Sequence, residues 1–340
     1  MSGRMRVLVT GSTGFVGSHT AAALAAAGYE LRLFVRDPQK ARRVLRVQGL
    51  DLPEHAVGDV TDAAACREAL QGCDAVVHTA GVVALERHRA GEVLATNLAG
   101  VKNIVGQAAD AGLDPIVFVS SVGALFQPMV AVAPDSPVIE GENAYARSKS
   151  QSENYVRELQ AAGAPILTTY PTAVIGPDDP GISGSNRAIV TLMKDVFPLT
   201  SSGFQAVDVR DVARVHTRLI ERRGTSGRYL VGGHYFSWPE LGELLTRVSG
   251  ARLRRVPLPG WSMRLGGRVC DVAKRFVDFD FPMTKEGMAF ATQWAPADSS
   301  KTCAELGIDF RDPAETLRDT IVWMHRAGHL RARHVGRLAV

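Results

Sequence analysis

The chain has 340 residues, enough for one large or two smaller domains with an ample core. A hydrophobic content of 46% and a charged content of 22% exclude a disordered or fibrous chain, and a net charge of +4 gives no argument for a nucleic-acid partner. The cysteines, Cys66, Cys73, Cys270 and Cys303, lack CxxC or zinc-like spacing, so we expect a reduced, cytoplasmic protein with no metal site.

The first predicted element is a strand–turn–helix unit at the start of the chain. The apolar run 7–9 leads into the turn 10–17, TGSTGFVG, and then into an alanine-rich segment that ends at Gly28. Glycines at positions 11, 14 and 17 suit a tight turn, a close approach of backbone to ligand and close helix–strand packing. The N–H groups that open the helix would face a pyrophosphate. An ordinary connection is the alternative, but the N-terminal context favours a dinucleotide site.

The residues at the end of the second predicted strand, 30–35, indicate which nicotinamide cofactor the chain binds. Asp37 can cap the next helix and Pro38 suits its first position. NAD-preferring folds place a carboxylate near the end of this strand, whereas this chain has Val35 and then Arg36. A guanidinium there favours the 2′-phosphate of NADP(H), with NAD possible and a solvated surface arginine as the alternative.

Strands and helices alternate as far as residue 170. The further expected strands are 56–57, 74–78, 116–119 and 166–170, and the expected helices are 39–48, one from Asp62 to Gly72, 91–111 and 144–162. This order predicts an α/β fold, a Rossmann-type doubly wound parallel sheet. The uncharged stretch 115–134 is long enough to span a bilayer, but its polar residues favour a buried strand followed by an active-site loop.

Small or polar residues follow several of these strands, where ligands bind in such sheets. Asp59 could accept a hydrogen bond from an adenine amino group, or be a plain turn residue. Thr79, Ala80 and Gly81 are small enough for a cofactor to lie against them. His78 is expected to be a packed strand residue.

Beyond Pro171 the regular alternation ends. Residues 176–184 form a loop, and 207–213 predict a return to the sheet followed by a helix. We expect a dinucleotide-binding domain at 1–175 with 204–228, and a smaller interleaved substrate lobe at 176–203 with 229–325. Residues 326–340 are expected to form a solvated, partly disordered basic tail. The amphipathic segment 261–281 is expected to cover the pocket rather than to lie on a membrane.

The catalytic candidates are Tyr145, Lys149 and Ser121. Tyrosine and lysine four residues apart share one helix face. An ammonium beside a phenol lowers the phenol's pKa, so that it can act as general acid or base. Ser121 at a strand end would hydrogen-bond the same substrate oxygen. The alternative is that the tyrosine and lysine are a chance pair on a surface helix. The glycine turn and the serine count against this alternative.

The motifs TGSTGFVG, GDV, HTAG, VSSV, YARSK and YPTAVIGP occur in an order and spacing that resembles the extended short-chain dehydrogenase/reductases, the NAD-dependent epimerase/dehydratase superfamily. VRDP and PTAVIGP look most like its dihydroflavonol-4-reductase-like branch, which uses NADPH. The resemblance implies catalysis by Ser121, Tyr145 and Lys149, support of the site by Asn97, and a homodimer through the helices that contain Asn97 and Tyr145. It also implies cofactor contacts from Gly11, Thr13, Gly14, Phe15, Val16, Asp59, Val60, Ala80, Pro171, Thr172, Ala173 and Val174.

The sequence therefore predicts an NADP(H)-dependent oxidoreductase acting on a carbonyl or secondary alcohol of a small, hydrophobic molecule. A nucleotide-sugar epimerase or dehydratase is weakened by Tyr170 in place of the common arginine and by a loop after Gly123 that lacks Tyr-Gly. Two further hypotheses are a steroid dehydrogenase of the 3-beta-hydroxysteroid type, which could act beside a membrane, and a non-catalytic nucleotide sensor.

Overall fold

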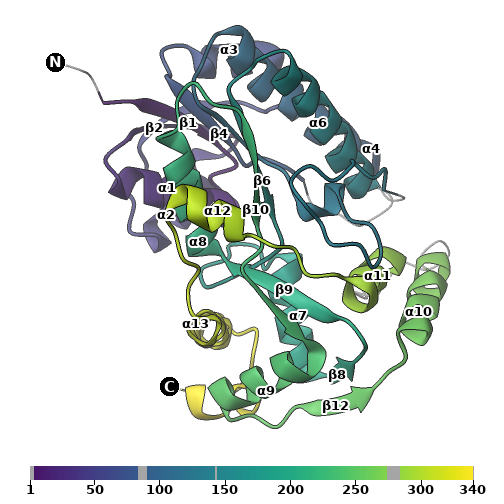
Figure 1. Cartoon of the computed structure of the whole chain (residues 1–340). Helices are drawn as coiled ribbons and strands as arrows, with labels where there is room; N and C mark the ends of the chain where they lie inside the picture. The colour runs from purple at the N-terminus through teal and green to yellow at the C-terminus, as the bar shows by residue number, and fades with distance from the viewer. Residues whose placement is uncertain (1–3, 83–89, 142–143, 274–283, 340) are drawn as a thin grey trace.

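A seven-stranded parallel sheet forms the centre of the protein, in the order β10-β6-β5-β4-β1-β2-β3 (Figure 1). The computed structural model describes residues 4–82, 90–141, 144–273 and 284–339. The strands of this sheet are β1 (Arg6–Thr10), β2 (Glu30–Val35), β3 (Glu54–Val57), β4 (Ala75–His78), β5 (Ile116–Val119), β6 (Ile166–Pro171) and β10 (Gly227–Val231). The predicted doubly wound fold is confirmed.

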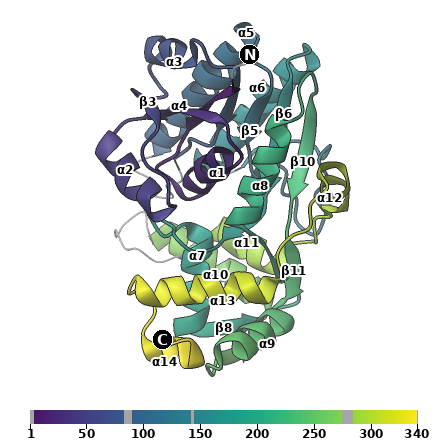
Figure 2. The same ribbon diagram turned by 90° about the vertical axis from the view of Figure 1, so that its left-hand side faces the viewer.

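Helices cover both faces of the sheet (Figure 2). One layer contains α1 (Phe15–Ala26), α2 (Pro38–Val47), α8 (Val209–Ile220) and α12 (Ser300–Leu306). The other contains α3 (Ala63–Leu70), α4 (Ala90–Val101), the π-helical turn η2 (Lys102–Gly106), α5 (Gln107–Asp110) and α6 (Ala144–Ala161). In β1, Val7 and Val9 join the first layer's core and Leu8 joins the second, as a strand buried on both faces requires.

Local signals set the helix starts as predicted. The Asp37 carboxylate accepts hydrogen bonds from the backbone N–H of Gln39 and Lys40 and so caps α2. Asp62 caps α3 in the same way. Side-chain caps of this kind stabilise a helix by about 1 kcal/mol. The predicted helix 91–111 is interrupted by the η2 turn.

A second lobe lies below the carboxyl ends of the central strands in Figure 1. Its three-stranded sheet contains β7 (Ala173–Ile175), β9 (Gly203–Asp208) and β11 (His234–Ser237), and β8 (Val196–Leu199) pairs with β12 (Arg254–Pro257). Its helices are α7 (Gly184–Lys194), α9 (Trp238–Ser249), α10 (Gly260–Ala273), α11 (Lys285–Gln293), α13 (Pro313–Arg326) and α14 (Ala332–Val335). The short 3-10 turns η3 (Val122–Ala124) and η4 (Gly336–Leu338) complete the described elements. The smaller C-terminal lobe expected from the sequence is confirmed.

The strand that starts at Gly203 does not return to the central sheet, so that part of the prediction for 207–213 is wrong. It is β9, and it pairs with β7 and β11. Asp208 at its end is held in the second lobe by hydrogen bonds from Arg210 and from Thr316 of α13. The predicted helix exists as α8, which packs on α1, and the strand that joins the central sheet is β10.

Residues 326–339 are folded, so the expected partial disorder of the tail is wrong for them, although most of their side chains are exposed as expected. Leu330 and Val335 are buried in the core of the second lobe. The guanidinium of Arg337 donates a hydrogen bond of 3.1 Å to the carbonyl of Val248 in α9. The two buried apolar side chains therefore anchor this segment, although it carries four arginines.

The two segments whose composition raised a membrane role have defined places in the fold. Residues 116–119 form β5 in the central sheet, and none of the helices described is both long and apolar enough to cross a bilayer. The amphipathic segment 261–281 begins as α10, and its residues 274–281 lie outside the described part of the chain.

Candidate active site

The glycine turn after β1 brings the backbone close to the end of β4. Gly11 has φ +73°, and a Cβ atom there would lie 2.7 Å from the backbone nitrogen of Ala80. A Cβ at Gly17 would lie 2.2 Å from the carbonyl oxygen of Gly11. Both positions therefore require glycine. These contacts fix the turn at the point between β1 and β4 where the strand order reverses, the usual ligand crevice of such sheets.

The start of α1 has no side-chain cap. Its N-cap residue is Gly14, Thr13 precedes it, and Phe15 and Val16 open the helix. Uncapped N–H groups at a helix N-terminus are suited to phosphate oxygens. The Ser12 hydroxyl is buried and has no hydrogen-bond partner among the described residues.

Hydrogen bonds tie the end of β4 to β1. Thr79 Oγ1 donates to the carbonyl of Thr10 over 2.7 Å, and the N–H of Ala80 donates to Thr10 Oγ1 over 3.3 Å. His78 Nδ1 lies 2.8 Å from the same hydroxyl, and burial lowers the pKa of this imidazole to about 3. His78 is a packed strand residue, as predicted.

Asn97 of α4 joins the loop after Gly81 to α6. Its Oδ1 accepts a hydrogen bond of 2.7 Å from the N–H of Val82, and its Nδ2 donates to the hydroxyl of Ser148 over 2.9 Å. That hydroxyl donates to the carbonyl of Tyr145 over 2.7 Å. Asn97 thus positions the helix segment that carries Tyr145.

Ser121, Tyr145 and Lys149 line one cavity of about 170 Å³. The serine lies just beyond β5, and the tyrosine and lysine lie one turn apart on α6. The Ser121 side chain hydrogen-bonds the Tyr145 side chain, and Lys149 Nζ donates to the carbonyl of Val119 over 3.4 Å. The structure therefore brings together the three side chains selected as a catalytic group.

The opposite wall of the cavity comes from α11, which no sequence motif indicated. Glu286 and Phe290 both line the cavity. Phe290 stacks on Phe126 at 4.0 Å between ring centroids and on Trp294 at 5.7 Å. The wall is apolar apart from one carboxylate. It lies about 140 positions beyond Tyr145 in the chain, and only the fold brings it here.

The electrostatics of the cavity differ from the sequence-based expectation of an acidic phenol. Burial of the phenol, followed by the negative charge of Glu286, raises the pKa of Tyr145 to about 12, against an opposing effect of the Ser121 hydrogen bond. Burial lowers the pKa of Lys149 to about 8, partly opposed by Glu153. In the chain by itself the prediction of a lowered Tyr145 pKa is wrong, because the cost of burying a phenolate prevails.

Glu153, one turn beyond Lys149, is fully buried and accepts three hydrogen bonds. The donors are the hydroxyls of Ser120 and Tyr170 and Nε of Arg157, the last over 2.9 Å. These contacts join the ends of β5 and β6 to α6. They also explain Tyr170, which replaces the arginine common in the family, since its hydroxyl serves the buried carboxylate.

Arg36 and Asp59 face each other beyond the ends of β2 and β3. Arg36 Nη1 lies 3.5 Å from Asp59 Oδ2, and 72% of the Arg36 side chain is exposed. Hydrogen bonds from Thr61 and the charge of Arg36 lower the pKa of Asp59. Because Asp37 caps α2, its carboxylate is engaged with backbone N–H groups. The guanidinium of Arg36 is the more exposed member of its pair with Asp59, whose side chain is 38% exposed.

The other residues predicted at the cofactor follow β3 or lie at and beyond the end of β6. The Val60 carbonyl accepts a hydrogen bond of 2.9 Å from Asn103 Nδ2. Pro171 ends β6, and the Thr172 hydroxyl donates to the carbonyl of Gly232 over 2.8 Å. Thr172 and Ala173 line the Tyr145 cavity, and Val174 follows in β7.

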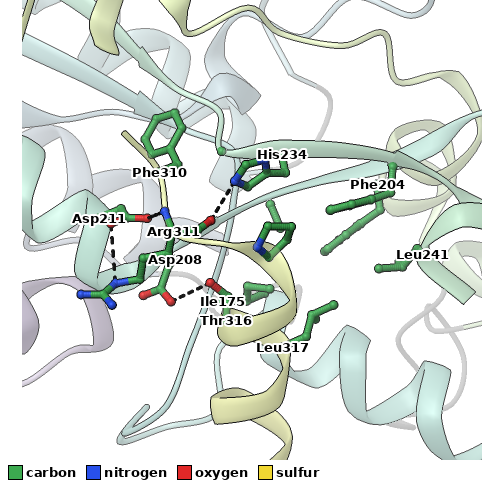
Figure 3. A pocket seen from close by; sticks show the side chains of 14 residues that line it. Ile175, Phe204, Asp208, Asp211, His234, Leu241, Phe310, Arg311, Thr316 and Leu317 are labelled. Atoms are coloured by element: carbon green, nitrogen blue, oxygen red, sulfur yellow. Dashed lines mark hydrogen bonds and ion pairs between the residues drawn. The ribbon is translucent and has the colours of Figure 1, made fainter. Parts of the chain in front are cut away.

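A second cavity, of only about 20 Å³, lies between α13 and the sheet that contains β9 and β11 (Figure 3). Asp211 accepts a hydrogen bond from the N–H of Arg311, and His234 Nε2 lies 2.8 Å from the Arg311 carbonyl. This space holds about one water molecule, so these residues tie the segment before α13 to α8 and β11 rather than bind substrate.

Comparison with known proteins agrees with this architecture. Residues 7–232 match the NAD dependent epimerase/dehydratase family. The chain is 26% identical over 334 residues to a putative dihydroflavonol 4-reductase of Synechocystis, and the match covers 96% of each chain. It is 28% identical over 343 residues to a rice cinnamoyl-CoA reductase 1, and this match covers 95% of this chain and 91% of that one. A UDP-glucose-4-epimerase of Stenotrophomonas maltophila, crystallised with NAD, superposes with a TM-score of 0.73 at 21% identity, covering 96% and 99% of the chains.

The chain belongs to the NAD dependent epimerase/dehydratase family. The family and the reductases among the relatives make it an NAD(P)-dependent oxidoreductase. The resemblance to the dihydroflavonol-4-reductase-like branch is confirmed.

Glu153→Gln should lower the free energy of unfolding by about 3 kcal/mol, because it leaves the partly buried Arg157 without its carboxylate. The measurement is chemical denaturation followed by circular dichroism. Glu158→Gln, an exposed change on the same helix, is the control and should shift stability by no more than about 0.5 kcal/mol. Equal effects of the two changes would contradict a special role for the buried carboxylate.

Proposed function

We propose that the protein uses NADP(H) to reduce a carbonyl, or to oxidise a secondary alcohol, of a small hydrophobic substrate, with Tyr145 as general acid and base. The observation that carries the proposal is the shared cavity of Ser121, Tyr145 and Lys149, closed by the aromatic wall of α11. The cofactor supplies or accepts the hydride.

The proposed cofactor residues follow the crevice from end to end. Gly11, Thr13, Gly14, Phe15 and Val16 would hold the pyrophosphate, and Arg36 the 2′-phosphate. Asp59 and Val60 would lie at the adenine. The nicotinamide end would lie among Thr79, Ala80, Gly81, Tyr145, Lys149, Pro171, Thr172 and Val174.

Within the cavity each group has a distinct task. Ser121 would donate a hydrogen bond to the substrate oxygen and stabilise charge that develops on it. With a pKa of about 12, Tyr145 stays protonated near neutral pH, so it can deliver its proton to that oxygen during reduction. The Lys149 ammonium would stabilise the phenolate that remains.

The chemistry of the wall supports an apolar substrate. Phe290 brings an aromatic ring to the cavity, and Phe126 and Trp294 stack on that ring. Glu286 would repel a carboxylate or phosphate placed beside Tyr145. This combination favours a hydrophobic carbonyl compound over a nucleotide sugar.

We also propose a division of labour between the lobes. The expected bounds move, because β7 and β9 pair in the second lobe and β10 pairs in the central sheet. The central sheet with its helices would bind the dinucleotide, and the second lobe would bind the substrate. A homodimer through α4 and α6, which pack against each other, and a cytoplasmic location complete the proposal.

Tyr145→Phe should lower kcat/KM by about 10²–10⁴-fold, because it removes the proton donor. A panel of ketones, aldehydes and secondary alcohols, followed by the absorbance of the reduced nicotinamide, gives the substrate and the rates. Binding of NADPH, measured by calorimetry, should be unchanged. Tyr155→Phe on the same helix is the control and should retain full activity. Near-normal turnover by the Tyr145 variant would refute the catalytic assignment.

Arg36→Ala should weaken NADPH binding by about 10–100-fold, because one charge-assisted contact to the 2′-phosphate is lost. NADH binding should change little. Fluorescence titration of both nucleotides measures the two dissociation constants. Arg46→Ala, at the far end of α2, should leave both unchanged. If Arg36→Ala weakened both nucleotides equally, the 2′-phosphate role would be wrong.

A further inference from the structure

Large exposed apolar side chains are concentrated in one region of the described chain. Val47 and Val57 are exposed singly, on α2 and β3. The other six belong to two segments, Met129 and Val130 in one, and Trp261, Leu265, Val269 and Val272 of α10 in the other. Single exposed apolar residues are ordinary, whereas a cluster marks an interaction site.

The four side chains on α10 form one stripe along the helix. Their spacing of four, four and three residues places them on the same face. Their exposed fractions are 63% for Trp261, 52% for Leu265, 59% for Val269 and 49% for Val272. The opposite face packs on α11, because a Cβ at Gly267 would lie 2.7 Å from the Thr284 carbonyl. The stripe therefore faces away from α11, and α10 itself lies at the edge of the molecule (Figure 1).

Both segments are attached to α11, the wall of the catalytic cavity. Arg264 of α10 donates to the Thr292 hydroxyl over 2.9 Å, and Asp271 accepts from the N–H of Lys285 over 2.8 Å. The N–H of Met129 donates to the carbonyl of Gln293 over 2.8 Å. The two segments that carry the exposed apolar residues are thus bonded to the helix that brings Glu286 and Phe290 to the cavity.

Charge decides which partner fits this face. Of the three charged residues of α10, Arg264 and Asp271 bond to the α11 side, whereas Arg268 is exposed and lies within the stripe by its spacing from Trp261 and Leu265. A second copy would bring two such arginines together, and six side chains are far fewer than the roughly 20–30 residues a side of a stable protein interface. An anionic lipid surface complements the arginine and needs only a short amphipathic helix with an interfacial tryptophan.

We propose that α10 and residues 127–130 dock the protein on an anionic lipid surface, from which an apolar substrate reaches the Tyr145 cavity beneath α11. The entry of substrate rests on the function proposed above, whereas the docking does not. The sequence predicts instead that segment 261–281 covers the pocket. The outward direction of the stripe favours the lipid role instead.

The test is sedimentation of the full-length protein with vesicles of phosphatidylcholine containing phosphatidylglycerol. The wild-type protein should pellet with them. The double variant Trp261→Ser/Leu265→Ser should lower the vesicle-bound to free ratio by about tenfold or more. Val47→Ser/Val57→Ser, which removes two equally exposed apolar side chains elsewhere, should pellet like the wild type. Arg268→Gln should reduce binding roughly fivefold, and only to the anionic vesicles.

Two further measurements keep the outcomes distinct. Tyr145→Phe should pellet normally while losing turnover, so a failure of the catalytic proposal would leave the docking result intact. Failure of the wild-type protein to pellet, or equal loss in both double variants, would overturn the docking proposal. A third result would also overturn it. Analytical ultracentrifugation would show that the wild-type protein is a dimer and that Trp261→Ser/Leu265→Ser is a monomer, while neither protein bound the vesicles.

Discussion

The site depends on the burial of a charged group on α6. Glu153 is inaccessible to water and would be costly without partners, so Ser120, Tyr170 and Arg157 all donate to it. These donors come from the ends of β5 and β6 and from the helix itself. Because Ser121 follows Ser120 directly, and Lys149 and Tyr145 lie one and two turns from Glu153, a single buried carboxylate sets the position of the sheet relative to the helix that carries Tyr145 and Lys149.

Hydrogen bonds of Trp294 fix the second wall of the cavity. The indole N–H of Trp294 donates to Oε1 of Gln205 over 3.0 Å, and the Ser202 hydroxyl donates to the Trp294 carbonyl over 2.9 Å. Gln205 belongs to β9, so the aromatic wall after α11 is anchored to the second lobe's sheet. The cavity therefore lies where the central sheet meets a separately built wall. In such an arrangement the wall can vary without disturbing the helix that carries Tyr145 and Lys149.

The parts that could be predicted from the sequence are those set by local chemistry. Apolar runs, glycines and capping aspartates indicated the central sheet, and the spacing of Tyr145 and Lys149 indicated the helix face. Glu286 and Phe290 escaped prediction because their place depends on contacts between distant segments. The raised pKa of Tyr145 escaped for a related reason, since burial and the charge of Glu286 follow from packing. The fold of residues 326–339 also escaped prediction, because their arginines indicate a solvated tail, whereas the burial of Leu330 and Val335 depends on packing.

The most direct test of the central claim is the crystal structure of the protein with NADPH. The account predicts the pyrophosphate against the turn from Gly11 to Phe15, the 2′-phosphate beside Arg36, and the nicotinamide at the cavity, with its reactive carbon about 3–4 Å from the space a substrate carbon would occupy next to Tyr145. A nucleotide bound elsewhere, or one whose nicotinamide pointed away from the cavity of Ser121, Tyr145 and Lys149, would contradict it.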